Sequence, residues 1–246
     1  MQSFNYSFNN ISFNFSKILL DYYNKKYGTA ITSLENLHEI LNVFTAEERE
    51  ELVKIKLFGI NDRKSVLLRD YYDLIDGDHT FIQLYNKFIE EIIKKTHYPK
   101  ETHLLFQTTP NLRISFPEST SIGARPDYDP EGIVGLHTDG EFGHLDEEMN
   151  FIIPLTEMFD TNSVYYEDKI GSNTPYDEYP IVTLSKDHYF RGRLNQLKHY
   201  NRVNKTGQTR VSLDIRVIPY SEYKEKDVCS VSSRKKFVVG EYYSMI

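Results

Sequence analysis

The sequence of 246 residues contains no tryptophan and a single cysteine, Cys229. One thiol can form neither an internal disulfide framework nor a cysteine-based zinc site. No apolar run reaches the roughly 18 residues that a membrane-spanning helix requires. The N-terminus also lacks the basic region and unbroken apolar run of a secretory signal. Together these absences predict a cytoplasmic protein with a reduced thiol and no membrane partner.

Positive charge is scarce as well. The chain has 29 Lys and Arg against 36 Asp and Glu, which gives a net charge of −7. Proteins whose main task is to bind a nucleic-acid backbone normally carry a basic domain or stripe, so we expect no nucleic-acid partner. Aromatic residues are plentiful by contrast, with 19 Tyr and 15 Phe. They are compatible with an enzyme pocket for a small-molecule substrate, although composition alone does not predict one.

Helical signals fill the first hundred residues. The segments "TSLE" (32–35) and "TAEE" (45–48) both match a capping box, with Thr at the N-cap and Glu three residues later. Apolar side chains recur over 81–93 with the spacing of a broad helical stripe. Asp78 can cap the start of that helix. We therefore expect residues 1–102 to be mostly helical.

Beyond Pro99 the sequence changes to short apolar runs bounded by Pro, Gly, Asn and Asp, which is typical of strands and turns. The runs are "HLLFQTT" (103–109), "LRISFP" (112–117), "MNFIIPL" (149–155), "SVYYED" (163–168), "PIVTL" (180–184) and "TRVSLDIRVIP" (209–219). Helices followed by many short strands favour a mainly β sandwich or barrel with helices packed on one outer face. Since no repeat or flexible linker interrupts the chain, we expect a single domain over 1–246. It would comprise a helical N-terminal buttress (1–102), a β core (103–220) and a C-terminal extension (221–246).

The tripeptide "HTD" within "GLHTDGEFGH" (135–144) is a candidate metal site. Residues i and i+2 of a strand project to the same face, so His137 and Asp139 can aim an imidazole and a carboxylate at one point. A lone HxD motif occurs by chance in many proteins, and a third ligand must come from elsewhere. His144 competes with His137 as a ligand, but its spacing to Asp139 does not suit one strand face. A position beside a ligand or the substrate fits His144 better.

His199 is the most informative of the remaining histidines because the segment "TRVSLDIRV" (209–217) follows it. One face of this segment carries Arg210, Ser212, Asp214 and Arg216, and the other carries Val211, Leu213, Ile215 and Val217. On alternation alone, a half-buried strand with a solvated polar face is favoured. If the apolar face packs against the N-terminal helices instead, the polar face points into the barrel. Arg210 is then a fixed guanidinium that can grip a carboxylate with two hydrogen bonds.

Taken together, "HTD", His199 and the triplet "RVS" (210–212) resemble the Fe(II)/2-oxoglutarate-dependent dioxygenases. Within that superfamily, further segments resemble the streptomycin-biosynthesis (StrG-like) subgroup. These segments are "GLHTDGEFGH", "EMNFIIPLT", "TNSVYYED", "HYNRVNKTGQTRVSLDIRV" and the terminal "GEYY". The resemblance covers residues 104–246, and the first hundred residues carry no motif of this kind.

The resemblance implies a double-stranded β-helix core, the jelly-roll found in cupin-like proteins. It implies that His137, Asp139 and His199 hold Fe(II). It also implies that Arg210 and Ser212 anchor 2-oxoglutarate, with dioxygen as the second cosubstrate. The implied activity is oxidation, most simply hydroxylation, of a small molecule such as a sugar, a cyclitol or another specialised metabolite.

Several nearby side chains are further candidates for the pocket. The amide of Asn150 either binds the cosubstrate, aligns a metal ligand, or simply satisfies the backbone. The candidate substrate-binding residues are Arg113, Gln107, His144 and Tyr165. An exposed arginine is the plainer interpretation of Arg113.

Two other classes of protein remain open. A cupin-type sugar isomerase or epimerase would use a histidine as general base on a similar barrel, but it has no need of the "RVS" triplet. A non-catalytic barrel that binds a small molecule is the other, and the three intact ligand types argue against it. The N-terminal helices are candidates for a homodimer face.

Overall fold

The computed structural model describes residues 4–51, 66–118, 134–230 and 234–246. Its helices lie almost entirely in the N-terminal part of the chain, as the capping and periodicity signals predict. They are α1 (Phe15–Tyr27), the 3-10 helix η1 (Leu34–Val43), α2 (Ala46–Glu51), α3 (Val66–Gly77), α4 (His79–Phe88), the π-helical segment Ile89–Lys94 and α5 (Lys95–His97). Among the described residues, no helix combines the length and apolar character needed to cross a bilayer.

The predicted helix caps can be compared with the observed ones. The box at 45–48 is confirmed, because Thr45 Oγ1 accepts from the amide of Glu48 at 3.2 Å and Glu48 Oε2 accepts from the amide of Thr45 at 2.9 Å. Asp78 caps α4 as expected, accepting from the amide of Thr80 at 2.9 Å. The box at 32–35 is wrong. η1 has Ser33 at its N-cap, and that side chain makes no capping hydrogen bond.

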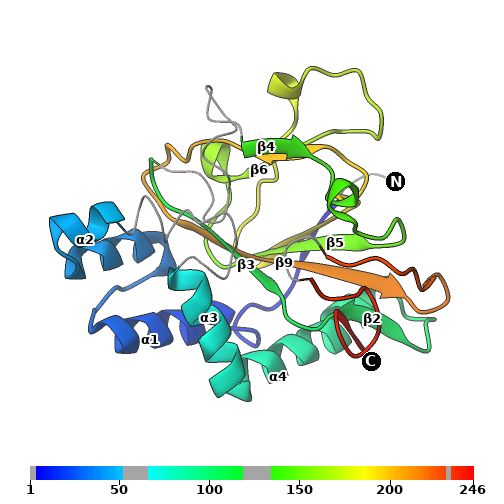
Figure 1. Cartoon of the computed structure of the whole chain (residues 1–246), viewed down its shortest axis with the longest axis horizontal. Helices are drawn as coiled ribbons and strands as arrows, with labels where there is room; N and C mark the ends of the chain where they lie inside the picture. The colour runs from blue at the N-terminus through cyan, green and yellow to red at the C-terminus, as the bar shows by residue number, and fades with distance from the viewer. Residues whose placement is uncertain (1–3, 52–65, 119–133, 231–233) are drawn as a thin grey trace.

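The rest of the chain forms two antiparallel sheets. The larger has seven strands: β1 (Phe4–Ser7), β7 (His188–Gly192), β5 (Met149–Pro154), β9 (Arg210–Pro219), β2 (Leu104–Gln107), β10 (Tyr243–Met245) and β3 (Asn111–Ser115), which also pairs with β9. The smaller has the order β4 (Val134–His137), β8 (His199–Asn201), β6 (Val164–Tyr166). Figure 1 shows the small sheet above the long strands β5 and β9, with α1, α3 and α4 below them. The mainly β class with N-terminal helices therefore holds, and the described strands do not close into a barrel.

Two details of the strand predictions change. The run "PIVTL" (180–184) forms no regular strand and makes only isolated bridges, from Ile181 to Tyr165 and from Leu184 to Met158. The large sheet also recruits both ends of the chain, since β1 pairs with β7 and β10 pairs with β2. The sheet is thus not confined to residues 103–220.

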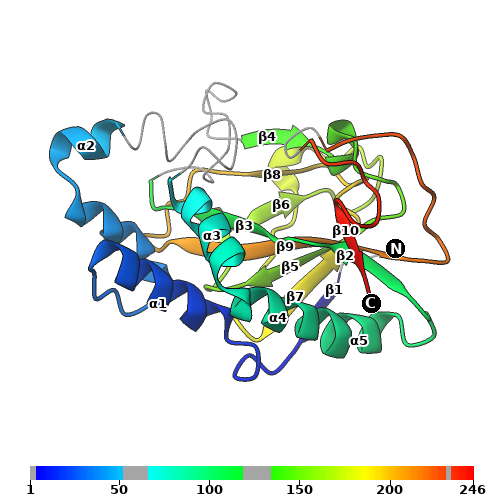
Figure 2. The same cartoon turned by 60° about the horizontal axis from the view of Figure 1, so that its bottom comes forward.

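Strand β9 lies at the centre of the large sheet and separates two environments. Its apolar side chains join one large core with residues from α1, η1, α3 and α4. Figure 2 shows these helices lying along one face of the sheet. The polar face is buried too, because Arg210 and Ser212 are each 2% exposed and Arg216 is 1% exposed. The interpretation that alternation alone favoured, a solvated polar face, is therefore wrong.

Candidate metal centre

The small sheet brings two histidines into register. His137 ends β4 and His199 begins β8, and the two residues are paired across these strands. Asp139 follows in a 3-10 turn (Asp139–Phe142). Its Oδ1 lies 3.9 Å from His137 Nε2 and 3.7 Å from His199 Nε2. The three ligand atoms all lie within 4.8 Å of one another, which is close enough for one metal ion to contact them all.

Both imidazoles are oriented by the backbone in the same way. His137 Nδ1 is bonded to the carbonyl oxygen of Gly135, and His199 Nδ1 lies 3.0 Å from the carbonyl oxygen of Leu197. A carbonyl oxygen can only accept, so each Nδ1 carries the proton and each Nε2 keeps its lone pair free for a metal. Gly135 has a φ of 52°, a left-handed conformation that suits glycine. This conformation helps to turn its carbonyl toward the His137 ring.

The second carboxylate oxygen of Asp139 is held by the large sheet. Oδ2 accepts from Arg216 Nη2 at 2.6 Å and from Asn150 Nδ2 at 2.7 Å. Burial alone would raise the pKa of Asp139, but the Arg216 guanidinium holds that pKa well below its usual range. The carboxylate is therefore ionised and has one oxygen, Oδ1, directed at the two imidazoles. Three functions were open to Asn150: binding the cosubstrate, aligning a metal ligand, or satisfying the backbone. The hydrogen bond to Asp139 agrees with the second of these.

The loop that carries Asp139 is docked on the backbone. The amide of Asp139 donates to Leu194 O at 2.9 Å and that of Gly140 donates to Asn195 O at 3.0 Å. A Cβ at Gly140 would lie 2.7 Å from the Asn195 carbonyl oxygen, so glycine permits this close approach. Asn195 is fixed in turn, because its amide donates to Asn150 Oδ1 at 3.3 Å.

The centre is more open on the side of His137. The His137 side chain is 27% exposed, against 10% for His199 and 9% for Asp139. Phe142, an exposed aromatic, packs edge-on against His137 with ring centroids 5.0 Å apart. Burial, and next the neighbouring His199, lowers the pKa of His137 to about 4, so its imidazole is neutral at physiological pH. A neutral imidazole is the form that binds a metal.

Arg210 extends the site along β8. Its Nη1 donates to Asn201 Oδ1 at 2.9 Å. Asn201 follows His199 by two positions, so it is on the same strand face and about 7 Å further along. Burial, and next the charge of Arg113, lowers the pKa of Arg210 to about 10, which still leaves a cation at neutral pH. Ser212 is buried on the same face of β9.

Arg113 and Gln107, two candidates for substrate contact, lie on strands next to β9. Arg113 pairs in register with Ser212 and its Nη2 lies 3.6 Å from Asp214 Oδ2. After burial, the charge of Arg113 contributes to the lowered pKa of Arg210 and, to a lesser extent, of His137. Gln107 is buried and its Oε1 accepts from Arg216 Nη1 at 3.4 Å. It supports the arginine that holds Asp139.

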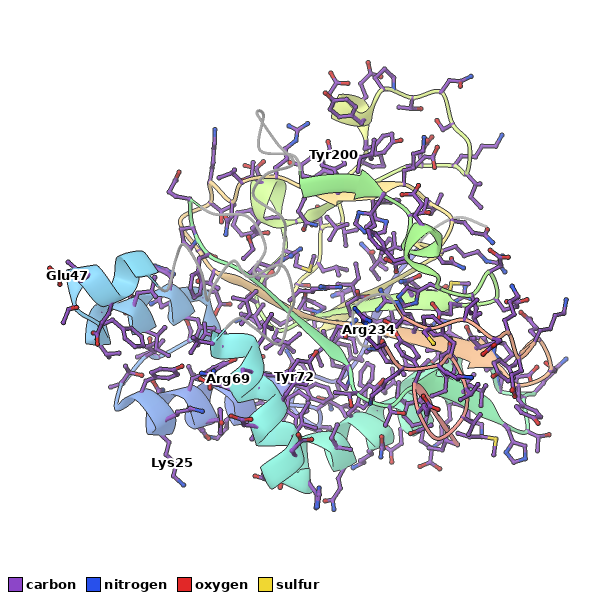
Figure 3. All side chains as sticks on the ribbon, viewed as in Figure 1. Lys25, Glu47, Arg69, Tyr72, Tyr200 and Arg234 are labelled. Carbon is purple, nitrogen blue, oxygen red and sulfur yellow. The ribbon has the colours of Figure 1, made fainter. Side chains whose placement is uncertain are left out.

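His144 and Tyr165, the other two candidates, are not brought to the metal-ligand atoms. His144 Nδ1 lies 2.7 Å from Glu148 Oε2, and its ring packs on Phe237 with centroids 4.9 Å apart. Tyr165 stacks on Tyr200, with centroids 5.0 Å apart. In Figure 3, Tyr200 lies by the small sheet, on the opposite side of the molecule from Arg69 and Tyr72 of α3. Tyr166 is the residue paired with His199 and shares its face.

Sequence reasoning missed the role of Arg216. The alternation of β9 had put this residue on the polar face with Arg210, but nothing in the sequence indicated its partner. The partner is Asp139, 77 positions earlier. Glu148, which is fully buried behind Arg216, gave no signal beyond its place just before a strand.

The donor set suits a divalent transition metal. Two imidazoles and one carboxylate on one side of an ion leave other coordination positions open, as in the 2-His-1-carboxylate centres of non-haem iron enzymes. The fixed Nε2 lone pairs and the ionised Oδ1 meet the requirements of such a centre. His137, Asp139 and His199 are therefore the residues that would hold the metal.

Comparison with known proteins gives one sequence relative of note. No family model matches the sequence. The chain is 25% identical over 185 residues to the streptomycin biosynthesis protein StrG of Streptomyces griseus. The aligned region covers 75% of this chain and 78% of StrG, so the similarity extends over most of both proteins.

The solved structures that resemble this chain have lower sequence identity to it than StrG has. The nickel complex of the non-heme monooxygenase ThoJ has a TM-score of 0.43 at 16% identity, covering 87% of this chain and 71% of ThoJ. AviO1 from Streptomyces viridochromogenes Tue57 has a TM-score of 0.42 at 11% identity, covering 91% and 92%. HygX from Streptomyces hygroscopicus with iron bound has a TM-score of 0.31 at 11% identity, covering 81% and 98%. At these scores the likenesses carry no argument about the present chain.

Proposed function

We propose that this protein is a non-haem Fe(II)/2-oxoglutarate-dependent oxygenase that oxidises, most simply hydroxylates, a small-molecule metabolite. The observation that carries the proposal is the convergence of His137 Nε2, His199 Nε2 and Asp139 Oδ1 within 4.8 Å. Fe(II) bound there would supply open positions for a 2-oxo acid and dioxygen, and with them the oxidising power. The sequence resemblance supports the same activity, and the similarity to StrG, a streptomycin biosynthesis protein, supports a role in biosynthesis.

The position of Arg210 supports the choice of cosubstrate. Its guanidinium contacts β8 about 7 Å beyond His199. A five-carbon dicarboxylate that chelates a metal through its 2-oxo acid end extends its other carboxylate over a comparable length. Arg210 can bind that distal carboxylate with a two-pronged, charge-assisted contact. The buried setting strengthens the interaction, because little water competes there.

The substrate and the remaining fold assignment are part of the same proposal. 2-Oxoglutarate and dioxygen would be converted to succinate and carbon dioxide, with one oxygen atom passing to the substrate. The name of StrG suggests a substrate from specialised-metabolite biosynthesis, such as a sugar or cyclitol. We further propose that the two facing sheets are a double-stranded β-helix of the cupin-like type.

The activity is tested by preparing metal-free protein under anaerobic conditions and adding Fe(II) and 2-oxoglutarate. We expect a weak visible charge-transfer band, and succinate after aeration, with more in the presence of an accepted substrate. The His199→Ala variant is the control and should give neither signal. No band and no succinate from the wild-type protein, even with candidate sugars and cyclitols, would rule out the oxygenase.

The role of Arg210 has its own test. We expect Arg210→Ala to weaken 2-oxoglutarate binding roughly 10- to 100-fold, since hydrogen bonds to charged groups contribute about 1.5–3 kcal/mol. Affinity for the metal alone should be unchanged. Arg202→Ala is the matched control, because Arg202 stacks on Tyr165, 4.6 Å from its ring centroid, on the other face of β8. If metal occupancy falls as much as cosubstrate affinity, Arg210 does not have this role.

A further inference from the structure

The two oxygens of Asp139 have different surroundings. Oδ1 faces the two imidazoles, whereas Oδ2 accepts hydrogen bonds from Arg216 at 2.6 Å and from Asn150 at 2.7 Å. Two donors at these distances occupy both lone pairs of Oδ2. A metal ion held by the histidines therefore meets a carboxylate that has only one oxygen to offer.

Arg216 is itself fixed by several partners. Its side chain is 2% exposed, and its Nη2 also lies 3.2 Å from Asp214 Oδ2. On the other edge, Nη1 donates to Gln107 Oε1 at 3.4 Å. Burial alone would lower the pKa of Arg216, but Asp139 and Asp214 raise it well above its usual value. The guanidinium is a permanent cation with little freedom to rotate away from Asp139.

The C-terminal strand reaches this arginine through Glu148. Glu148 is fully buried, and its Oε2 lies 3.9 Å from Arg216 Nε. The hydroxyl of Tyr243 donates to Glu148 Oε1, and His144 Nδ1 lies 2.7 Å from Oε2. Tyr243 is the last residue of the terminal "GEYY" segment and lies in β10, paired with Gln107. That segment, which had no assigned role, thus belongs to the support of Asp139.

We propose that Arg216 is a positioning residue that confines Asp139 to coordination through Oδ1 alone. The inference rests on the proposed function in taking an anionic 2-oxo acid as the ligand. If Oδ2 were released, the carboxylate could bind the metal through both oxygens and fill a position that the 2-oxo acid needs. Arg216 therefore keeps that position open.

Arg216 has a second, electrostatic effect on the same step. Arg216 adds one positive charge 2.6 Å from Asp139 and so beside the metal position, and Asp214, 3.2 Å from Arg216, offsets this charge only in part. The added charge repels the metal cation and attracts a dianionic chelator. Both effects of Arg216 thus lower the affinity for the metal alone and raise the affinity for the cosubstrate.

These two effects distinguish a positioning role of Arg216 from a merely structural one. A buried ion pair that only stabilises the fold predicts that loss of Arg216 weakens metal and cosubstrate binding together. Positioning predicts changes in opposite directions. The folded variant should bind the metal as tightly as wild type or more tightly, and the 2-oxo acid more weakly.

The experiment compares the wild-type protein with Arg216→Gln under anaerobic conditions. Fe(II) and Co(II) are titrated first in the absence of cosubstrate, and 2-oxoglutarate is titrated into the metal-loaded protein afterwards. We expect unchanged or tighter metal binding and roughly 10-fold weaker 2-oxoglutarate binding. Loss of a partner that merely supports a metal ligand typically weakens metal binding roughly 10- to 100-fold instead. The Co(II) absorption spectrum should also change, reporting the extra carboxylate oxygen. Equal weakening of metal and cosubstrate binding would overturn the proposal.

Matched variants make the test specific. Arg191→Gln removes an arginine from β7, which β5 separates from β9. The Arg191 guanidinium lies over the ring of Tyr98, 5.9 Å from its centroid, and this variant should change neither affinity. Arg216→Lys restores the charge and one donor, and should recover part of the 2-oxoglutarate affinity. Tyr243→Phe removes only the hydroxyl on Glu148, and should shift both affinities in the same directions as Arg216→Gln by a smaller factor.

The test still works if Arg216→Gln does not fold or if the wild-type protein does not bind 2-oxoglutarate. If thermal melts show that Arg216→Gln does not fold, Asn150→Ala is used instead, because it frees one lone pair of Oδ2 without burying an unpaired charge. If wild type binds the metal but not 2-oxoglutarate, the proposed function fails while the inference is still tested. Oxalate, a small chelating dianion, then replaces 2-oxoglutarate, and the same opposite changes are expected.

Discussion

The two sheets contribute to the candidate centre in different ways. The small sheet supplies both imidazoles, from β4 and β8, and none of its described side chains belongs to the core that joins the helices to the large sheet. The large sheet supplies no metal ligand. From β5 and β9 it provides the groups that hold Asp139 and the arginine proposed for the cosubstrate. Metal ligation and the helix-backed core are thus assigned to separate sheets. The sheets are connected by the contacts of Asp139, by the hydrogen bond from Arg210 to Asn201, and by a smaller buried cluster that includes Val164 and Phe190.

Removal of a ligand from the small sheet tests this separation most severely. His199→Ala should abolish metal binding, because two of the three donors cannot hold a transition metal alone at comparable affinity. The free energy of unfolding of the metal-free protein should change little, since His199 is outside the helix-backed core. Metal titration and thermal melts provide the measurements, with the exposed His103→Ala as control. A large loss of metal-free stability would show that the two sheets are not separable.

The converse change is made in the large sheet. Leu213 is fully buried on the apolar face of β9, so Leu213→Ala should reduce the free energy of unfolding by about 2–5 kcal/mol. Its side chain points away from Asp139, and the folded variant should bind metal with wild-type affinity. Urea denaturation and metal titration would check both statements. A parallel loss of metal affinity would mean that strain in β9 reaches the metal ligands themselves.

A smaller effect is the dependence of the free energy of unfolding on pH, through a histidine on the helix side of the large sheet. His97 Nε2 lies 2.8 Å from the hydroxyl of Tyr189, and burial, followed by the charge of Arg191, lowers the pKa of His97 to about 4. The unfolded chain takes up this proton near pH 6.5, whereas the folded chain does so only near pH 4. His97 therefore contributes to a loss of stability as pH falls from about 6.5 to about 4.

That contribution can be isolated by substitution. His97→Gln should reduce the slope of stability against pH in this window, as measured by urea denaturation at intervals of half a pH unit. His79→Gln, at an exposed position at the start of α4, is the matched control and should leave the slope unchanged. An identical slope in wild type and His97→Gln would exclude His97 as a source of the pH dependence.

The sequence was informative where the pattern is local. Helical periodicity, the cap at Asp78 and the alternation of β9 each depend on residues within a few positions, and each is found in the structure. The capping box at 32–35 is a local prediction that failed, but the failures that concern the site occurred where the outcome depends on distant contacts. Alternation could not tell that the polar face of β9 is buried, because that depends on the small sheet lying above it. The contact between Arg216 and Asp139 was unforeseeable for the same reason.

The candidate site shows the same difference between features set by local sequence and features set by distant contacts. His137 and Asp139 were predicted to share one point as positions i and i+2 of a strand. The structure brings their ligand atoms within 3.9 Å, but Asp139 lies in a 3-10 turn that follows the strand. Adding His199 and Arg210 required the family resemblance, since their separation in sequence has no local signature. Strand alternation puts Tyr165 and Tyr166 on opposite faces, but only the pairing of Tyr166 with His199 tells which of the two shares the face of His199.

The backbone contacts of the two imidazoles bear on the order in which the centre assembles. Each Nδ1 is bonded to a carbonyl only two residues earlier, so each donor can acquire its tautomer as soon as its own short segment forms. The clamp on Asp139 needs closure of a 77-residue loop, a far larger entropic cost. In a folding chain, the Nε2 atoms of His137 and His199 can therefore be in the metal-binding tautomer before the complete metal centre has formed. On the proposed role of Arg216, tight binding of a 2-oxo acid, rather than of the metal alone, reports that β9 has reached its place in the sheet.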